Sequence, residues 1–243
     1  MKLIKLSAIE STNSYLKEMN SIIQLEDEII VWTNSQTNGR GQMGASWYSE
    51  PGKSLTFSML KRYSGLPAES AVAINLAVSL GVASALDSLE IPGVKVKWPN
   101  DIMSANKKIA GILIENQLKG EHIASSVIGI GINVNNEKFV NLPKAGSLFL
   151  ATDRTYEPEV VLRTVAGSIL MELGKFPAQT LETLKDTYES MLFRKGIASK
   201  FQREDGSQFM GEILGVNHTG DLQVIMEDAS LRCFQLKEIE LLY

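Results

Sequence analysis

The sequence predicts an α/β (α+β) fold divided into two compact units. Strand-like apolar runs and helix-length stretches share the chain up to Phe193-Arg194, whereas after Gly196 the chain changes to short strands separated by turns. Turn signals at intervals of about eight to twelve residues are typical of a small β-barrel. A chain of 243 residues also has the length of one large domain, or of one domain with an appendage. We therefore expect one domain over residues 1–193 and a second over 194–243.

The composition is that of an ordinary globular protein, with 44% hydrophobic and 21% charged residues. The 24 basic residues are outnumbered by 28 acidic ones, so the chain as a whole does not have the basic character of a nucleic-acid-binding protein. A single cysteine, Cys233, excludes a disulfide within the chain and suits a reducing compartment, which makes the cytoplasm the expected location. His122 and His218 are far apart and offer no spacing typical of a metal site.

No segment of the sequence predicts a secretory signal or a membrane span. Charges interrupt the amino terminus, and the longest uncharged run, residues 70–86, is shorter than the roughly 20 apolar residues that cross a bilayer. We interpret that run as part of a buried helix and expect no membrane partner.

The first predicted elements are a strand over Met1–Leu6 and a helix that begins near Ser11-Thr12-Asn13. These three side chains all favour helix N-caps, and Tyr15, Leu16 and Met19 follow at helical spacing. One cap is sufficient for one helix, so the remaining polar side chains could bind a polar ligand.

A glycine-rich loop, Gln36–Gly44, follows the apolar strand Ile29–Trp32. Its glycines allow a close approach of backbone N–H groups, and Arg40 offers a planar set of donors, so the loop is suited to a carboxylate or phosphate. The spacing Gly39-x-Gly41-x-x-Gly44 also fits a dinucleotide-binding motif, but a strand follows here where that motif requires a helix. Trp47, just beyond the loop, is either a core aromatic residue or a wall of the site.

The periodicity and breaker residues predict the remaining elements of the first unit. We expect strands over 54–60, 94–97, 107–115 and 123–134, helices over 67–89, 157–176 and 181–191, and an irregular stretch over 136–154. The turn after the strand 94–97 contains a proline, which would fix Lys97, Asn100 and Asp101 at the strand end. Two neighbouring strands contain glycines, at Gly111, Gly129 and Gly131. Because these positions lack side chains, either a ligand or another backbone can approach closely there.

Four separated motifs give the chain a resemblance to the biotin protein ligases. They are Ser11-Thr12-Asn13, Gln36–Gly44 with Trp47, Lys97-Trp98-Pro99-Asn100-Asp101 followed by Lys108-Ile109-Ala110-Gly111-Ile112, and Gly129–Asn135. The resemblance implies a catalytic domain related to class II aminoacyl-tRNA synthetases, with a mixed sheet flanked by helices, followed by an SH3-like β-barrel. Because the first motif begins so near Met1, it also implies the monofunctional type, which lacks the DNA-binding domain and has no DNA partner.

The implied reaction joins biotin and ATP into biotinyl-AMP and then transfers biotin to a lysine of a biotin carboxyl carrier protein or domain, as in acetyl-CoA carboxylase or another biotin-dependent carboxylase. By resemblance, the catalytic residues are Lys108 and Arg40. The implied biotin contacts are Ser11, Thr12, Asn13, Gln36, Gly39, Arg40, Lys108, Gly111, Gly129 and Gly131. The implied ATP contacts are Arg40, Gly41, Gln42, Trp47, Lys97, Asn100, Asp101 and Asn133. The cofactor is Mg²⁺, bound through the nucleotide phosphates, with Asp101 as a candidate protein ligand.

Two alternatives and one departure accompany this resemblance. A lipoate ligase or octanoyl transferase shares the general fold, and a biotin sensor without catalysis would share the binding residues. Many biotin protein ligases carry a second arginine, linked to retention of the adenylate, where this chain has Gln42, and Met43 is also uncharged. The sequence leaves both a monomer and a homodimer open.

Overall fold

The computed structural model describes residues 1–175 and 178–243. Its larger sheet has seven strands in the order β1-β2-β3-β7-β6-β5-β4. The strands are β1 (Lys2–Leu6), β2 (Ile29–Thr33), β3 (Ser54–Pro67), β4 (Val94–Lys97), β5 (Asp101–Ser104), β6 (Lys107–Lys119) and β7 (His122–Asn133). Only β1 and β2 are parallel among these neighbours, so the sheet is mixed, and the predicted α/β (α+β) class is confirmed.

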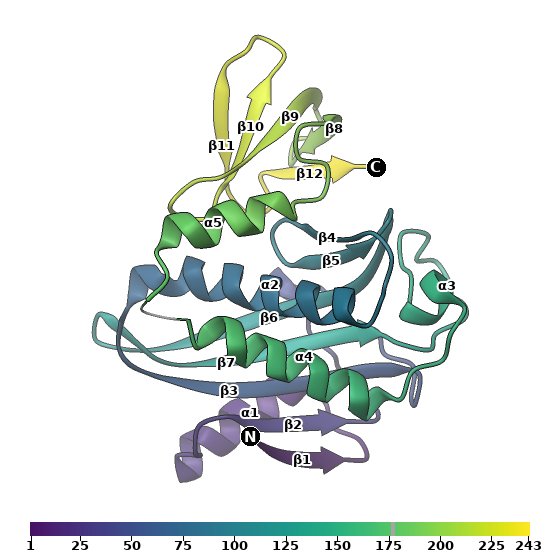
Figure 1. The fold of residues 1–243 in the computed structure, drawn as a ribbon, viewed down its shortest axis with the longest axis vertical. Coiled ribbons are helices and arrows are strands. Elements are labelled where there is room, and N and C mark those ends of the chain that lie inside the picture. Colours follow the sequence, from purple (N-terminus) through teal and green to yellow (C-terminus); the bar gives the residue numbers. More distant parts are fainter. Residues whose placement is uncertain (176–177) are drawn as a thin grey trace.

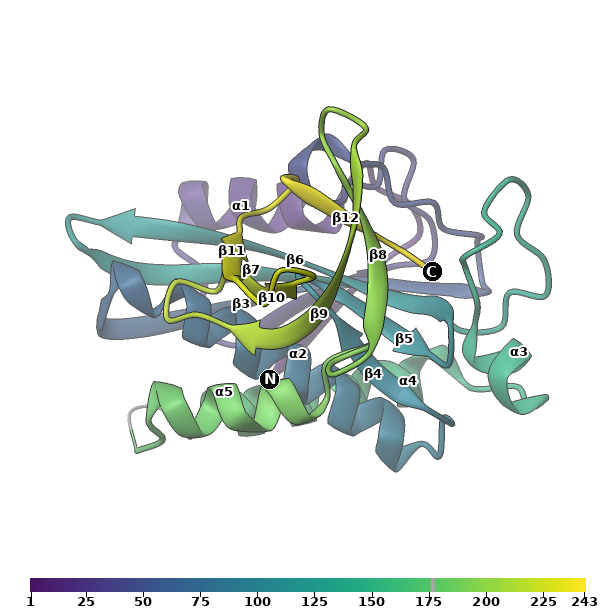
Figure 2. The same cartoon turned by 90° about the horizontal axis from the view of Figure 1, so that it is seen from above.

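Helices cover both faces of this sheet (Figure 1). They are α1 (Thr12–Ile23), α2 (Ala71–Ser88), α3 (Leu148–Thr152), α4 (Pro158–Leu173) and α5 (Leu181–Ser190). Helices α2 and α4 pack together on one face, while α1 lies on the other (Figures 1 and 2). The face that carries α1 also carries the glycine-rich loop, so the candidate site lies there.

Helix α2 forms the centre of the core because it is apolar on nearly all sides. The span Ala68–Ser88 is long and apolar enough to cross a membrane by composition, but 67% of an 18-residue apolar window within it is buried inside the fold, as in a core helix. Gly81 permits the close contact with α4, since a Cβ at this position would lie 2.7 Å from the Cα of Ile169.

The C-terminal part forms a separate antiparallel sheet of five strands in the order β11-β10-β9-β8-β12. The strands are β8 (Ala198–Arg203), β9 (Gln208–Val216), β10 (Leu222–Met226), β11 (Leu231–Phe234) and β12 (Ile239–Leu242). Stacked rings of Phe201, Phe209 and Phe234 fill its interior. This sheet lies beyond the β4–β5 edge of the larger one (Figure 1), where the Trp98 Nε1 donates to the Gly220 carbonyl at 2.9 Å. The domain boundary at 193/194 stays a prediction.

The structure corrects several predicted element bounds. The stretch expected to be irregular contains α3, which Ser147 caps by accepting from the Leu150 N–H. β5 was not predicted. Its four residues directly follow the proline-containing turn after β4 and pair back with β4 as a hairpin, and the sequence pattern of this stretch indicates only the turn. The strand predicted over 54–60 continues to Pro67, and α2 begins at Ala71. The predicted helix end at Phe176 lies outside the described residues.

Candidate active site

A cavity of about 800 Å³ lies between the larger sheet and the C-terminal sheet. Its volume is within the usual range for small-molecule sites. Most of the side chains and glycines that the sequence singles out line it, although they come from five separate parts of the chain: Ser11, Thr12, Asn13, Gln36, Arg40, Gly41, Gln42, Trp47, Lys97, Asn100, Asp101, Lys108, Gly111, Gly129 and Gly131. Gly39 and Asn133 are outside this lining.

Of the three cavity-lining residues at the start of α1, one is the helix cap. Ser11 is the N-cap and accepts from the Ser14 N–H, as the capping pattern predicts for one of the three side chains. Thr12 instead donates from its backbone N–H to the Gln36 Oε1 at 2.9 Å, and its hydroxyl lies 3.2 Å from the same oxygen. The helix start therefore fixes the first residue of the glycine-rich loop.

Ser58 on β3 connects the two residues after the cap. Its Oγ lies 2.7 Å from the Thr12 Oγ1 and 2.5 Å from the Asn13 Oδ1, and all three side chains are buried. The Asn13 Nδ2 then donates to the Glu115 Oε2 at 2.9 Å and reaches the Leu113 carbonyl at 3.3 Å. The amide of Asn13 is thus fully occupied by protein groups and holds the cavity floor together.

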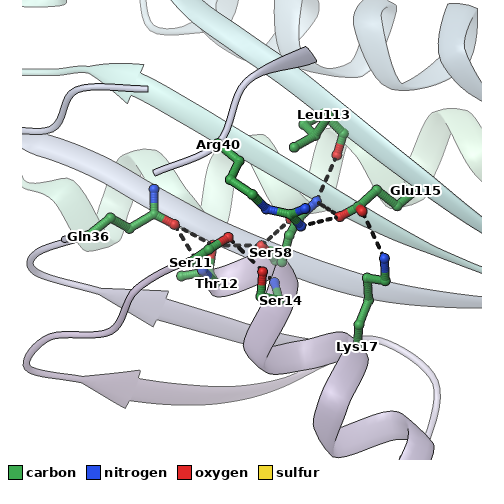
Figure 3. Close-up of polar contacts among 10 residues, drawn as sticks. Ser11, Thr12, Ser14, Lys17, Gln36, Arg40, Ser58, Leu113 and Glu115 are labelled. Carbon is green, nitrogen blue, oxygen red and sulfur yellow. Dashed lines mark hydrogen bonds and ion pairs between the residues drawn. The ribbon is translucent and has the colours of Figure 1, made fainter. Parts of the chain in front are cut away.

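Glu115 on β6 binds two cations at once (Figure 3). Its Oε1 pairs with the Lys17 Nζ at 2.8 Å, and its Oε2 pairs with the Arg40 Nη2 at 3.0 Å. Burial alone would raise the pKa of Glu115, but hydrogen bonds from Lys17 and Asn13 and the charge of Arg40 outweigh it, and the pKa is lowered. In this state Arg40 therefore turns toward a protein carboxylate.

Lys97, Asp101 and Lys108 form a second charged cluster at the other side of the cavity. The register of the β4–β5 hairpin places Lys97 opposite Asp101, with 3.5 Å between the Lys97 Nζ and the Asp101 Oδ2. The Lys108 Nζ lies 2.6 Å from the Asp101 Oδ1. Because two ammonium groups share this half-buried carboxylate, the cluster has a net positive charge and attracts anions.

The cluster includes Asp101, the predicted protein ligand of Mg²⁺. A carboxylate that two lysines already neutralise is a poor metal donor, and no group of three or more His, Cys, Asp or Glu side chains within residues 1–175 and 178–243 could hold a metal ion. The donor set therefore does not fit a metal resident on protein carboxylates.

Trp47 forms a wall of the cavity over the glycines of β6 and β7. A Cβ at Gly111 would lie 2.9 Å from its ring, and one at Gly131 would lie 2.6 Å from its Nε1. The Lys108 Nζ is 5.5 Å from the ring centroid. The buried Nε1 of Trp47 has no hydrogen-bond partner among the described residues, which favours the wall over the core interpretation.

Three predicted residues have mainly structural contacts. Asn100 lines the cavity, yet its Nδ2 donates to the Ile112 carbonyl at 2.7 Å. Asn133 is buried and donates to the Gly146 carbonyl at 2.9 Å. Gly39 is buried against Trp47, since a Cβ there would overlap the Trp47 carbonyl. Their roles as direct ligand contacts stay predictions.

Several residues at the site are absent from the sequence-based set. Ser58 and Glu115 lie on predicted strands. Two features of the sequence could have indicated them: Ser58 is on the polar face of β3, and Glu115 is a charged residue in an apolar strand. The C-terminal sheet contributes lining residues that no motif indicated, and the Lys237 Nζ donates to the Met43 carbonyl at 3.2 Å.

Comparison with known proteins identifies the family of the chain. The Biotin/lipoate A/B protein ligase family matches residues 6–133. The bifunctional ligase/repressor BirA of Escherichia coli is 36% identical over 173 residues, which are 68% of this chain and 52% of that protein. BirA of Bacillus spizizenii is 28% identical over 224 residues, which are 90% of this chain and 68% of that protein. The chain thus spans about half the length of the first of these curated relatives.

Solved structures of biotin protein ligases match the fold over nearly the whole chain. A biotin protein ligase from Aquifex aeolicus in complex with biotin and ATP has a TM-score of 0.81 and 28% identity, and the match covers 99% of this chain and 98% of that one. The apo structure of the same protein has a TM-score of 0.75. By its matched sequence, its fold and the order of its motifs, the chain belongs to the Biotin/lipoate A/B protein ligase family, within its biotin protein ligase branch.

Proposed function

We propose that this protein activates biotin with ATP and transfers it to a lysine of a biotin carboxyl carrier protein or domain. The observation that carries the proposal is the convergence of the glycine-rich loop, Lys108 and Trp47 on one cavity with a positively charged side. The Aquifex aeolicus relative with biotin and ATP supports the same pair of substrates.

In the first step, an oxygen of the biotin carboxylate attacks the α-phosphorus of ATP, and the bond to the β-phosphate breaks to release pyrophosphate. Two anions must approach each other, so fixed cations supply much of the acceleration. In this chain, the Lys108 ammonium and the Arg40 guanidinium would supply the positive charge that this step needs. Asp101 holds the Lys108 ammonium in place.

In the second step, the lysine amine of the carrier attacks the acyl carbon of biotinyl-AMP. The bond to AMP breaks, AMP leaves with the electron pair, and the attacking nitrogen loses a proton. Thr12 and Gln36 would read the polar head of biotin, and the ring of Trp47, which packs directly on Gly111 and Gly131, would face the nucleotide. Mg²⁺ would arrive on the phosphates of the nucleotide, because Asp101 is occupied by two lysines.

A mass measurement tests the proposal directly. A purified carboxyl carrier domain is incubated with this protein, biotin and Mg-ATP, and the expected mass increase is one biotin less one water at a single lysine. Omitting ATP is the control and should leave the mass unchanged. No increase in the complete mixture would refute the transfer step.

Lipoate or octanoate is the alternative substrate, since the matched family includes lipoate ligases. Exchange of labelled pyrophosphate into ATP discriminates the two: we expect exchange with biotin and little with lipoate. Exchange with lipoate alone would support the alternative. Biotin binding without any exchange would instead indicate a sensor.

A further inference from the structure

The two ends of the segment Gln36–Arg40 are held by one continuous network of polar contacts. At one end the Gln36 Oε1 accepts from Thr12, and at the other the Arg40 Nη2 donates to the Glu115 Oε2. Between them Ser58 contacts both Thr12 and Asn13, and Asn13 donates to the same Glu115 oxygen. Figure 3 shows these contacts, with Gln36 at one end and Arg40 and Glu115 at the other.

Glu115 is the carboxylate of this network and, like Ser58, is not among the residues that the resemblance implies. It does not line the cavity, yet its carboxylate is 22% exposed and has both oxygens in use, Oε1 by Lys17 and Oε2 by Asn13 and Arg40. Charged hydrogen bonds of this kind are stronger than those between neutral groups. Because Asn13 and Lys17 lie one turn apart on α1, the carboxylate has a rigid support.

The contact with Glu115 leaves Arg40 able to bind an anion. A guanidinium has five N–H donors, and Glu115 engages only the Nη2 group, so the Nε and Nη1 donors stay available. The ion pair also anchors the loop. Arg40 lies between two glycines, Gly39 and Gly41, and its side chain is 41% exposed, so the contact with Glu115 restrains a segment that is otherwise free to move. Without a partner, such a side chain would have many rotamers.

We propose that Glu115 is a positioning residue, which holds Arg40 through an ion pair and thereby keeps the glycine-rich loop closed over the cavity. The effect on substrate binding rests on the proposed function, whereas the effect on the loop does not. Loss of the carboxylate would leave Arg40 and Lys17 as neighbouring cations without their shared anion, which favours the open loop.

Limited trypsin digestion of the protein without substrates tests the effect on the loop, because trypsin cleaves after Arg40 only when this side chain is released. We expect Glu115→Gln to increase the rate of cleavage between Arg40 and Gly41 at least about three-fold, a size typical of one partly exposed ion pair. Cleavage after Lys61 in β3 is the internal reference, since global unfolding would accelerate both sites. Equal rates at Arg40 in the variant and the parent would overturn the proposal.

Glu159→Gln is the matched control. It removes a carboxylate that pairs with Arg163 at 2.7 Å on α4, on the opposite face of the sheet, and should leave cleavage at Arg40 unchanged. Equal acceleration by this control would also count against the proposal, because the effect would then not be specific to Glu115.

Pyrophosphate exchange then tests the effect on the reaction. A positioning role predicts that Glu115→Gln raises the KM for biotin at least about three-fold while kcat changes less than KM, because the loop closes less often. An unchanged KM with faster cleavage would overturn the link to substrate binding. If the parent protein shows no exchange with biotin, the proposed function fails, and the digestion still decides whether Glu115 holds the loop.

Discussion

Lys107 and Lys108 are neighbours in the chain with different surroundings. The Lys108 Nζ lies in the cavity beside Asp101, whereas the Lys107 Nζ is exposed and donates to the Pro143 carbonyl. We expect Lys108→Ala to reduce the rate of pyrophosphate exchange by about 100-fold, the size of losing one charge that stabilises the transition state. Biotin binding, measured by calorimetry, should change much less. Lys107→Ala is the control, and near-normal exchange in the Lys108 variant would remove this lysine from the chemistry.

Gln42 lines the cavity with an uncharged amide. By resemblance to ligases with an arginine here, Gln42→Arg should slow the release of biotinyl-AMP, because the added cation attracts the phosphate of the adenylate. The measurement is the decay of enzyme-bound adenylate after rapid dilution. Gln42→Leu removes the amide without adding charge and should not slow release. An equal or faster release from the arginine variant would contradict the prediction.

The ion pairs of Glu115 predict a pH dependence of the loop. Its pKa is lowered from the usual 4.5, and the charges that face it are Lys17 from α1 and Arg40 from the loop. A lowered pKa means that the stabilisation is present above pH 4.5 and is lost as the pH falls through the lower, folded-state value. Acrylamide quenching of Trp47 should therefore increase below pH 4.5, with Trp47→Phe assigning the signal. A Glu115→Gln variant with the same transition would show that another group titrates.

At the scale of elements, two helical glycines have opposite surroundings. A Cβ at Gly81 of α2 would lie 2.7 Å from the Ile169 Cα of α4, whereas Gly167 of α4 is exposed with open space around it. We expect Gly81→Ala to lower the free energy of unfolding by about 1–3 kcal/mol, because the helices must separate. Gly167→Ala should raise it by about 0.5–1 kcal/mol, because alanine favours the helix. Urea denaturation of both variants measures the difference, and a shift of the same sign in both would contradict the packing argument.

At the scale of the whole molecule, polar contacts of unequal burial attach the C-terminal sheet to the larger unit. The Trp98 Nε1 donates to the Gly220 carbonyl at 2.9 Å, and the Lys237 Nζ reaches the loop at Met43 from an exposed position. Trp98→Phe should lower the free energy of unfolding by about 1 kcal/mol, since a partly buried carbonyl loses its donor. Lys237→Met should change it by less than about 0.5 kcal/mol. Chemical denaturation compares the two, and equal effects would indicate that the Trp98 contact adds nothing specific.

The sequence by itself determined the elements and motifs that depend on local chemistry. Ser11 caps α1 because a side-chain oxygen can satisfy an N–H three residues along, whatever lies elsewhere in the fold. The hairpin of β6 and β7 follows from two apolar runs around Lys119-Gly120. The motifs also indicated the candidate site residues, most of which line one cavity.

Only the tertiary structure decided which partners those side chains have. Arg40 is 75 residues from Glu115 in the chain, and Asn13 is 102 residues from it, so no local pattern predicts their contacts. The same holds for Trp47 over Gly111 and Gly131, and for Asp101 between two lysines. Such pairings depend on strand order and register, which fix the distances between remote residues. For that reason the sequence indicated Arg40 as an anion-binding residue, and the fold alone showed that Glu115 holds it.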